Sequence, residues 1–511
     1  MSAKIPIIVG AADYKNRSKD VVDALEPAEL MARAIDAALD DAGSSKIRQS
    51  VDSIDCVINW GWPYSDLPGQ LAKRLGLNPL KHKDLSGMNG AEPNRLLDEA
   101  ARRIAYGETT VEVVTGGEAL ASLEAFQKAK KFPPPWTPSD NTPTETFKVS
   151  NRPRAKDLLQ RHGFMVPSQG YCLYENAYRA HRNQSIQANH DESVELYADF
   201  AQIAKKHPAA WNYGTAETKQ TIGTFSGKNR MIQFPYPLLM NAFNSVNLAG
   251  AVVLTSTEAA KAMGIPESKW VYIYGAAGTQ DSGNILLRPN YIESPALTRA
   301  LQTTMKVAGV TPSDLDAVDI YSCFPIVPKL ACAQLGLPVL NGPKPVTLLG
   351  GLTSFGGAGN SYSMHALVAM SKSIREGKYR KGLVLANGGW LTYEWAVVLA
   401  KTPRTDGVPY TTKAALPKEV TDVPIPPIAE VANGACVVES YTVQYSRDNK
   451  PELAIIVGRL NATGERFIAN EANEQTLKEF VSSREPVGRA GIVTSRNDTQ
   501  INMFSFGSSS L

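Results

Sequence analysis

One stretch of the sequence, V-D-I-Y-S-C-F-P-I-V-P-K-L-A-C-A-Q-L at residues 318–335, combines a buried strand, a sharp bend and a helix. Its first apolar residues predict a short strand that ends near Ile320. Pro325 and Pro328 cannot lie inside a central strand, so the chain must turn before the helical spacing begins. Cys323 is therefore expected just beyond the carboxyl end of a strand, where open α/β sheets form ligand crevices. The alternative is that Cys323 is a small buried apolar residue.

The composition is that of a globular protein, with 511 residues, 43% apolar residues, 20% charged residues and a net charge of +3. This length predicts about three domain-sized units. The charge is small and evenly spread, so no nucleic-acid partner is expected. No stretch is long and apolar enough to predict a membrane span.

The five cysteines are odd in number and scattered, which is typical of a reducing compartment. No Cys-x-x-Cys or His-Glu-x-x-His spacing occurs, so no metal site is expected. The chain starts without the long apolar run of a signal peptide, which favours a cytoplasmic location. Its last residues, S-S-L at 509–511, are a weak relative of the peroxisomal address S-K-L, so the peroxisome is the alternative.

The first part of the chain alternates strands with helices, which predicts a parallel sheet covered on both faces. The expected strands are residues 5–10, 51–60 and 111–114, and the main expected helices are residues 26–42 and 94–106. The second half repeats this pattern. A-I-D-A-A-L-D-D-A-G at 34–43 is echoed by A-L-Q-T-T-M-K-V-A-G at 300–309, and each is followed by a strand. Two copies of one α/β unit are therefore expected, with a site where they meet.

Two further regions interrupt or follow the repeat. Residues 119–236 form a long insertion with a proline-rich arm at 128–153 and expected helices at 174–182 and 193–206, so they are expected to cover the site. After a proline-rich linker, short strands and turns predict a small closed β-domain with five strands and one helix. Its expected strands are residues 434–444, 453–460, 466–468, 492–494 and 501–506, and its helix is 475–482.

This order of elements resembles the thiolase superfamily, most closely its sterol-carrier-type branch and the type 1 thiolase-like proteins with an extra C-terminal domain. The resemblance implies an α/β fold made of two βαβαβαββ halves in α-β-α-β-α layers, with a covering insertion and a C-terminal OB-like barrel. The expected domains are the N-terminal half at 1–118, the insertion at 119–236, the C-terminal half at 237–405 and the barrel at 406–511.

The loops that carry catalysis in this family are altered here. The position of the acylated cysteine falls on Gly90, and that of the histidine in the Gly-His-Pro loop falls on Gly357. The acid/base cysteine of the Cys-x-Gly loop becomes Ala386, in Ala386-Asn387-Gly388. The His-Asp-Cys-Phe loop corresponds to Y-S-C-F at 321–324, which keeps the cysteine and the phenylalanine.

A rebuilt site is therefore predicted around Cys323 and His365 as the catalytic residues. If His365 points back toward the bend, it would lower the pKa of Cys323 and make a thiolate. The alternative is that His365 packs between helix and sheet. The expected substrate-binding residues are Tyr321, Ser322, Asn360, Gly90, Gly357 and Asn387, of which Tyr321 and Asn360 would donate hydrogen bonds to a thioester oxygen. Residues 171–182 are expected to form an aromatic core stripe or to line an acyl channel.

The resemblance implies that the chain acts on an acyl-CoA thioester and needs no other cofactor. The first functional hypothesis is an acyl-CoA acyltransferase that makes or breaks C–C bonds at a non-standard site without the usual nucleophilic cysteine. The alternatives are a non-catalytic acyl-CoA- or lipid-binding protein and a subunit that depends on a partner chain. The expected oligomeric state is a homodimer or a monomer.

Overall fold

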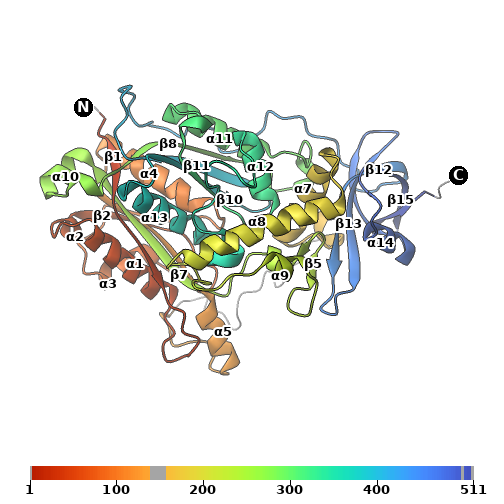
Figure 1. Ribbon diagram of the computed structural model, residues 1–511, viewed down its shortest axis with the longest axis horizontal. Helices are drawn as coiled ribbons and strands as arrows, with labels where there is room; N and C mark the ends of the chain where they lie inside the picture. Colours follow the sequence, from red (N-terminus) through yellow and green to blue (C-terminus); the bar gives the residue numbers. More distant parts are fainter. Residues whose placement is uncertain (1–2, 139–156, 497–499, 508–511) are drawn as a thin grey trace.

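The computed structural model describes residues 3–138, 157–496 and 500–507 (Figure 1). The part of the predicted proline-rich arm that follows residue 138 lies outside the described residues, as does the terminal S-S-L at 509–511. None of the described helices combines the length and the apolar character that a membrane crossing requires.

The centre of the molecule is a nine-stranded sheet in the order β3-β2-β4-β7-β1-β8-β11-β10-β9. Its strands are β1 (Pro6–Lys15), β2 (Val51–Cys56), β3 (His82–Leu85), β4 (Val111–Ala119), β7 (Asn247–Ser256), β8 (Val271–Gln280), β9 (Ala317–Ile320), β10 (Lys381–Gly388) and β11 (Tyr393–Ala400). The two halves join at β1 and β8, where only Ile7 and Ile8 pair with the second half. Strand β7 follows the insertion in sequence but pairs with β1 and β4, so the first half of the sheet includes it.

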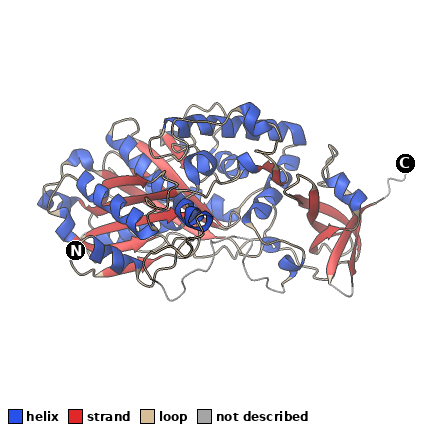
Figure 2. Cartoon of the chain, turned by 90° about the horizontal axis from the view of Figure 1, so that it is seen from below, coloured by secondary structure: helices blue, strands red, loops and turns tan. Residues whose placement is uncertain are grey.

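Helices cover both faces of this sheet and fill the space between its halves (Figures 1 and 2). Helix α1 packs on the first half and α11 on the second, while α4 and α13 contact strands of both halves and each other. These helices are α1 (Pro27–Asp41), α4 (Glu92–Tyr106), α11 (Pro295–Ala308) and α13 (Tyr362–Arg375). The predicted layered α/β fold is therefore confirmed, and the second half lacks a described counterpart of β3.

Local sequence signals explain where the repeated helices begin and end. Helix α11 begins with Pro295 directly after Ser294, whose hydroxyl oxygen accepts a hydrogen bond from the Leu297 amide at 3.2 Å. It ends at Gly309, which adopts a positive φ of 64° that a glycine tolerates without strain. The shorter helices are α2 (Ile47–Ser50), α3 (Leu67–Arg74), α5 (Leu120–Lys128), α6 (Leu158–Arg161), α9 (Lys219–Gly223), α10 (Thr257–Met263) and α12 (Ile326–Leu335).

The insertion contributes two long helices, α7 (Pro167–His181) and α8 (Ile186–Lys206), both of which start about seven residues earlier than the sequence predicted. In each helix the first turns carry polar residues, so the periodic spacing of apolar residues is not visible there. The local start signals were a proline in the first turn of α7 and a serine cap before α8. The predicted strand at 51–60 is shorter than expected, because the ladder with β4 ends at Cys56.

The C-terminal residues form the predicted closed barrel of five strands, which lies at one end of the molecule (Figure 1). Its elements are β12 (Gly434–Tyr445), β13 (Pro451–Leu460), β14 (Arg466–Glu471), α14 (Glu474–Phe480), β15 (Ala490–Arg496) and β16 (Ile501–Phe506). Two short strands of the insertion, β5 (Met231–Gln233) and β6 (Tyr236–Pro237), extend the sheet beside β12. Tyr441, Phe480 and Phe504 fill its core and are fully buried.

Candidate functional site

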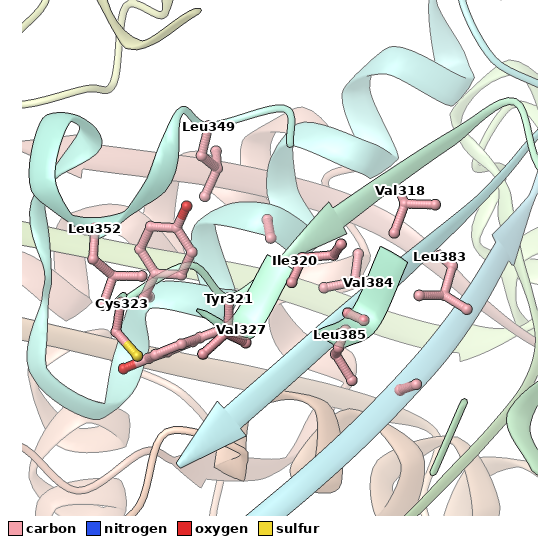
Figure 3. Packing of buried hydrophobic residues seen from close by; sticks show 14 of the residues in the cluster. Val318, Ile320, Tyr321, Cys323, Val327, Leu349, Leu352, Leu383, Val384 and Leu385 are labelled. Carbon is pink, nitrogen blue, oxygen red and sulfur yellow. The ribbon is translucent and has the colours of Figure 1, made fainter. Parts of the chain in front are cut away.

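The predicted bend follows strand β9 and leads into helix α12. Figure 3 shows Tyr321 and Cys323 just beyond the end of the strand that carries Val318 and Ile320. Pro325 has helical backbone angles and caps α12, so the bend occupies only the four residues before it. The Ser322 hydroxyl donates to the carbonyl of Ile320 at 2.7 Å, which ties the bend back to the strand.

The thiol of Cys323 lies among side chains from three separate elements. The Asn387 side-chain nitrogen lies 3.7 Å from the sulfur, and it also donates to the Tyr171 hydroxyl at 2.9 Å. Burial raises the pKa of Cys323 to about 12, and a hydrogen bond with Tyr171 only partly opposes this effect. The side chain is 6% exposed. The thiol is therefore protonated near neutral pH and is not a nucleophilic thiolate.

His365 does not act on this thiol. Its Nδ1 atom lies 2.6 Å from a carboxylate oxygen of Asp13 on β1, and its ring packs 5.1 Å from the ring of Phe355. The described groups that shift the pKa of Cys323 are Tyr171, Glu394 and backbone amides. The expectation that His365 lowers the pKa of Cys323 is thus wrong, because α13 directs the imidazole toward β1.

Gly90, where the resemblance leads us to expect the family nucleophile, has no room for a side chain. A Cβ atom on Gly90 would lie 2.3 Å from the backbone oxygen of Asn387 and 3.0 Å from the Tyr321 hydroxyl oxygen. The first distance is too short for a real Cβ atom and involves backbone, and the second is a tight contact with a side chain. A Cβ atom on Gly388 would likewise lie 2.7 Å from the Gly90 nitrogen. The turn before α4 therefore packs directly on the end of β10, and only glycine fits there.

The other predicted binding residues are partly occupied by contacts within the protein. The Asn360 side chain donates to the carbonyl of Ile58 at 3.0 Å and to the Met88 sulfur at 3.1 Å, so it holds two loops together. A Cβ atom on Gly357 would lie 2.5 Å from the Asn244 side-chain oxygen. The Tyr321 hydroxyl differs from these, because it makes no hydrogen bond to the described residues and faces the closed Gly90 position.

Two site residues were missed from the sequence. Tyr171 belongs to the 171–182 segment of the insertion, which the sequence alone left open between core and channel. Glu394 is fully buried on β11, where it lies directly across from Asn387 in the β10–β11 ladder. A carboxylate in the apolar run Y-E-W-A-V-V-L-A at 393–400 was the available signal for it.

A groove is formed between helix α5 and the segments that carry Lys19, Trp211 and Phe243. It has a volume of about 370 Å³, and its walls include Lys19, Lys128, Trp211, Phe243 and Ser245, with Glu124 as the acidic member. Two of these residues bind the loop that precedes α13: the Trp211 amide donates to Phe355 at 2.7 Å, and the Phe243 amide donates to Leu352 at 3.2 Å. In the described residues, no group of three or more histidine, cysteine, aspartate or glutamate side chains is placed to hold a metal ion.

Comparison with known proteins identifies a matching family model and a similar solved structure. Residues 415–498 match the family model of the thiolase-like protein type 1 additional C-terminal domain. The crystal structure of a monomeric SCP2-thiolase-like protein type 1 from Mycobacterium smegmatis is 29% identical, with a TM-score of 0.80, and the match covers 99% of this chain and 100% of that chain. No curated protein sequence matches the chain.

More distant structures share the fold alone. An Ltp2-ChsH2(DUF35) aldolase is 19% identical with a TM-score of 0.60, and the match covers 78% of this chain and 97% of that chain. Human mitochondrial 3-ketoacyl-CoA thiolase is 18% identical with a TM-score of 0.56, and the match covers 78% of this chain and 99% of that chain.

Proposed function

We propose that the chain is a thiolase-superfamily protein similar to the type 1 thiolase-like proteins, and that it binds an acyl-CoA thioester without forming a covalent acyl-enzyme. The observation that carries the proposal is the Asn387 carbonyl oxygen, which lies 2.3 Å from the position of a Cβ atom on Gly90. A nucleophilic side chain has no room at that point. Acyl transfer through a covalent intermediate requires an activated nucleophile there or nearby.

The groove supports the CoA part of the proposal. Lys19 and Lys128 supply positive charge that suits a diphosphate, and Trp211 and Phe243 offer aromatic faces for an adenine ring. The amides of Trp211 and Phe243 donate to the loop at 352–357, and the Leu352 amide of that loop donates to Ser322 in the bend, so the groove wall and the bend share one loop.

The residues at the bend support non-covalent recognition of a thioester. The Tyr321 hydroxyl has no partner among the described residues, which supports a role as a donor to a thioester oxygen. Burial raises the pKa of Tyr321 far above its ordinary value, so the phenol stays protonated and remains a donor. Cys323 likewise keeps its proton.

The acyltransferase hypothesis keeps one supporting observation, which is that Cys323 occupies the family's catalytic bend. Its raised pKa and the absence of His365 from its surroundings argue against a thiolate. Binding is therefore the better-supported function. We also propose that the chain is a monomer, because its relative from Mycobacterium smegmatis is described as monomeric and edge strand β3 (H-K-D-L) is short and charged.

The proposal is tested by calorimetry with CoA and hexanoyl-CoA, followed by intact-mass analysis after incubation with hexanoyl-CoA. We expect both ligands to bind and no acyl adduct to appear. The double charge reversal Lys19→Glu with Lys128→Glu is expected to weaken CoA binding at least about tenfold. The matched control is Lys413→Glu, since Lys413 is exposed and does not line the groove.

Two outcomes would overturn the proposal. The first is a wild-type chain that binds neither ligand, which would leave a partner-dependent subunit as the better hypothesis. The second is a stable hexanoyl adduct on Cys323, which would restore the acyltransferase hypothesis.

A further inference from the structure

A cluster of buried polar side chains lies beyond Cys323, and its polar groups are only partly paired. We call Tyr171, Tyr174, Arg288, Asn387 and Glu394 the Glu394 cluster. Tyr171 and Tyr174 lie one turn apart on α7, and Asn387 and Glu394 are directly paired across β10 and β11. The charge of Glu394 influences the pKa of Tyr174 and of the Cys323 thiol, and Arg288 influences that of Glu394, so these groups lie in one region of the interior.

Several atoms of the Glu394 cluster have no hydrogen-bond partner among the described residues. They are both carboxyl oxygens of Glu394, the side-chain oxygen of Asn387, the Tyr174 hydroxyl and the Nε of Arg288. All four side chains are at most 1% exposed. Arg288 is otherwise engaged, since it lies 2.9 Å from an Asp281 oxygen and donates to Thr392 at 2.9 Å. Arg288 therefore forms its ion pair with Asp281 and not with Glu394.

So many unpaired polar atoms in one place are unusual in a folded interior. More than nine in ten buried polar groups in proteins have a partner, and each group left without one costs roughly 1–3 kcal/mol. A ligand with a polar group would relieve this cost, whereas a hydrocarbon chain would not. The cluster therefore has the character of a recognition site.

The unpaired donors and acceptors of the Glu394 cluster indicate which polar group a ligand would carry. Burial raises the pKa of Glu394 well above its ordinary value, so its carboxyl group is neutral and can donate as well as accept. The Asn387 oxygen can only accept, and the Arg288 Nε can only donate. The hydroxyl group of an alcohol can donate one hydrogen bond to the Asn387 oxygen and accept another from a donor of the cluster. A ketone can only accept, so it would leave the Asn387 oxygen unpaired. A carboxylate ligand would face a neutral acid and an arginine that is already paired.

We propose that the Glu394 cluster binds the hydroxyl group of a hydroxylated acyl chain, with Glu394 as the residue that sets this specificity. This inference rests on the proposed acyl-CoA binding and names the acyl group that binds. The cluster borders the bend, because the Asn387 side-chain nitrogen lies 3.7 Å from the Cys323 sulfur.

The test compares hexanoyl-CoA with a set of hexanoyl-CoA probes that carry one hydroxyl group at each chain position in turn. Calorimetry of the wild-type chain is expected to find a hydroxylated probe that binds at least about tenfold more tightly than hexanoyl-CoA. Glu394→Met should abolish this preference while hexanoyl-CoA still binds. Glu394→Gln, which keeps a neutral donor and an acceptor, should retain the preference.

The outcomes separate this inference from the proposed function. If hexanoyl-CoA binds and no hydroxylated probe binds better, the specificity is wrong and the proposed function stands. If Glu394→Gln loses the preference as completely as Glu394→Met, an ionised carboxylate is required and the inference is also wrong. If no probe binds at all, the proposed function itself fails. Because Glu394→Gln preserves shape and neutrality, it keeps the test informative even if Glu394→Met does not fold.

Discussion

The carbonyl oxygen of Asn387 occupies the space that a side chain on Gly90 would need, since a Cβ atom there would lie only 2.3 Å from it. Gly90 lies in the turn before helix α4 in one half of the fold, and Asn387 is the penultimate residue of strand β10 in the other. The close approach of the two halves thus removes the room for a nucleophile. The packing of the two halves therefore requires glycine at position 90.

We expect that Gly90→Cys does not restore thiolysis of acetoacetyl-CoA. The new Cβ atom collides with backbone that cannot move aside, so the free energy of unfolding should fall by roughly 1–3 kcal/mol. Urea unfolding and a thiolysis assay measure the two effects. The matched control is Gly227→Cys, where a Cβ atom would meet nothing within 4 Å. A Gly90→Cys chain that is as stable as the control and thiolyses substrate would contradict this requirement for glycine.

We expect Cys323 to react slowly with iodoacetamide in the folded protein at about pH 7, because its pKa of about 12 leaves almost no thiolate. The labelling rate should rise with pH toward that value as long as the fold persists. Peptide mass analysis after timed labelling measures the rate, and labelling in urea supplies the upper limit. Rapid modification of Cys323 at neutral pH would instead indicate a thiolate and would favour the acyltransferase hypothesis.

Glu118 should make the stability of the protein depend on pH. It is fully buried at the end of β4, and burial raises its pKa from 4.5 to about 8, although the amides of Trp60 and Gly61 donate to it. A raised carboxyl pKa means that the folded chain holds a proton that the unfolded chain releases. The contribution of Glu118 is therefore fully favourable below pH 4.5 and is lost as the pH rises toward about 8.

Glu118→Gln replaces this group with one that does not titrate. The stability of the wild-type chain relative to Glu118→Gln should thus fall between about pH 4.5 and about pH 8 and be constant outside that window. Urea unfolding of both chains across this range measures the difference. A difference that does not change with pH would show that Glu118 has no raised pKa in the folded chain.

Lys329 joins the helix after the bend to the insertion and should be important for stability. Its ammonium group is fully buried and donates to Glu175 at 2.7 Å, to Asn189 at 2.8 Å and to Ser193 at 2.8 Å. Lys329→Met leaves the buried carboxylate without its cation, so unfolding free energy should fall by about 3–5 kcal/mol. Adding Glu175→Gln should recover part of the loss in urea unfolding. A single variant within about 1 kcal/mol of wild type would mean that the pair contributes little.

Much of the fold was predictable because its signals are local. The repeated helices and strands are predicted by the spacing of apolar residues, and the ends of α11 by the proline that starts it and the glycine that follows it. Turn residues predict the barrel. The altered catalytic loops were also readable, because Gly90 and Gly357 occur where the family pattern has reactive side chains. The functional pairings could not be predicted in this way, since they join residues that are distant in sequence.

The sequence by itself determined that two α/β units repeat and that a β-barrel follows them, and its resemblance to a known family led us to expect that the usual nucleophile is absent. Only the tertiary structure decided that His365 pairs with Asp13 rather than with Cys323, that Tyr171 of the insertion reaches the thiol and that Glu394 lies buried across from Asn387. Local sequence determines backbone conformation and the faces that must be buried. The partner and the pKa of a buried group depend on how those faces pack, because both are properties of the surrounding atoms.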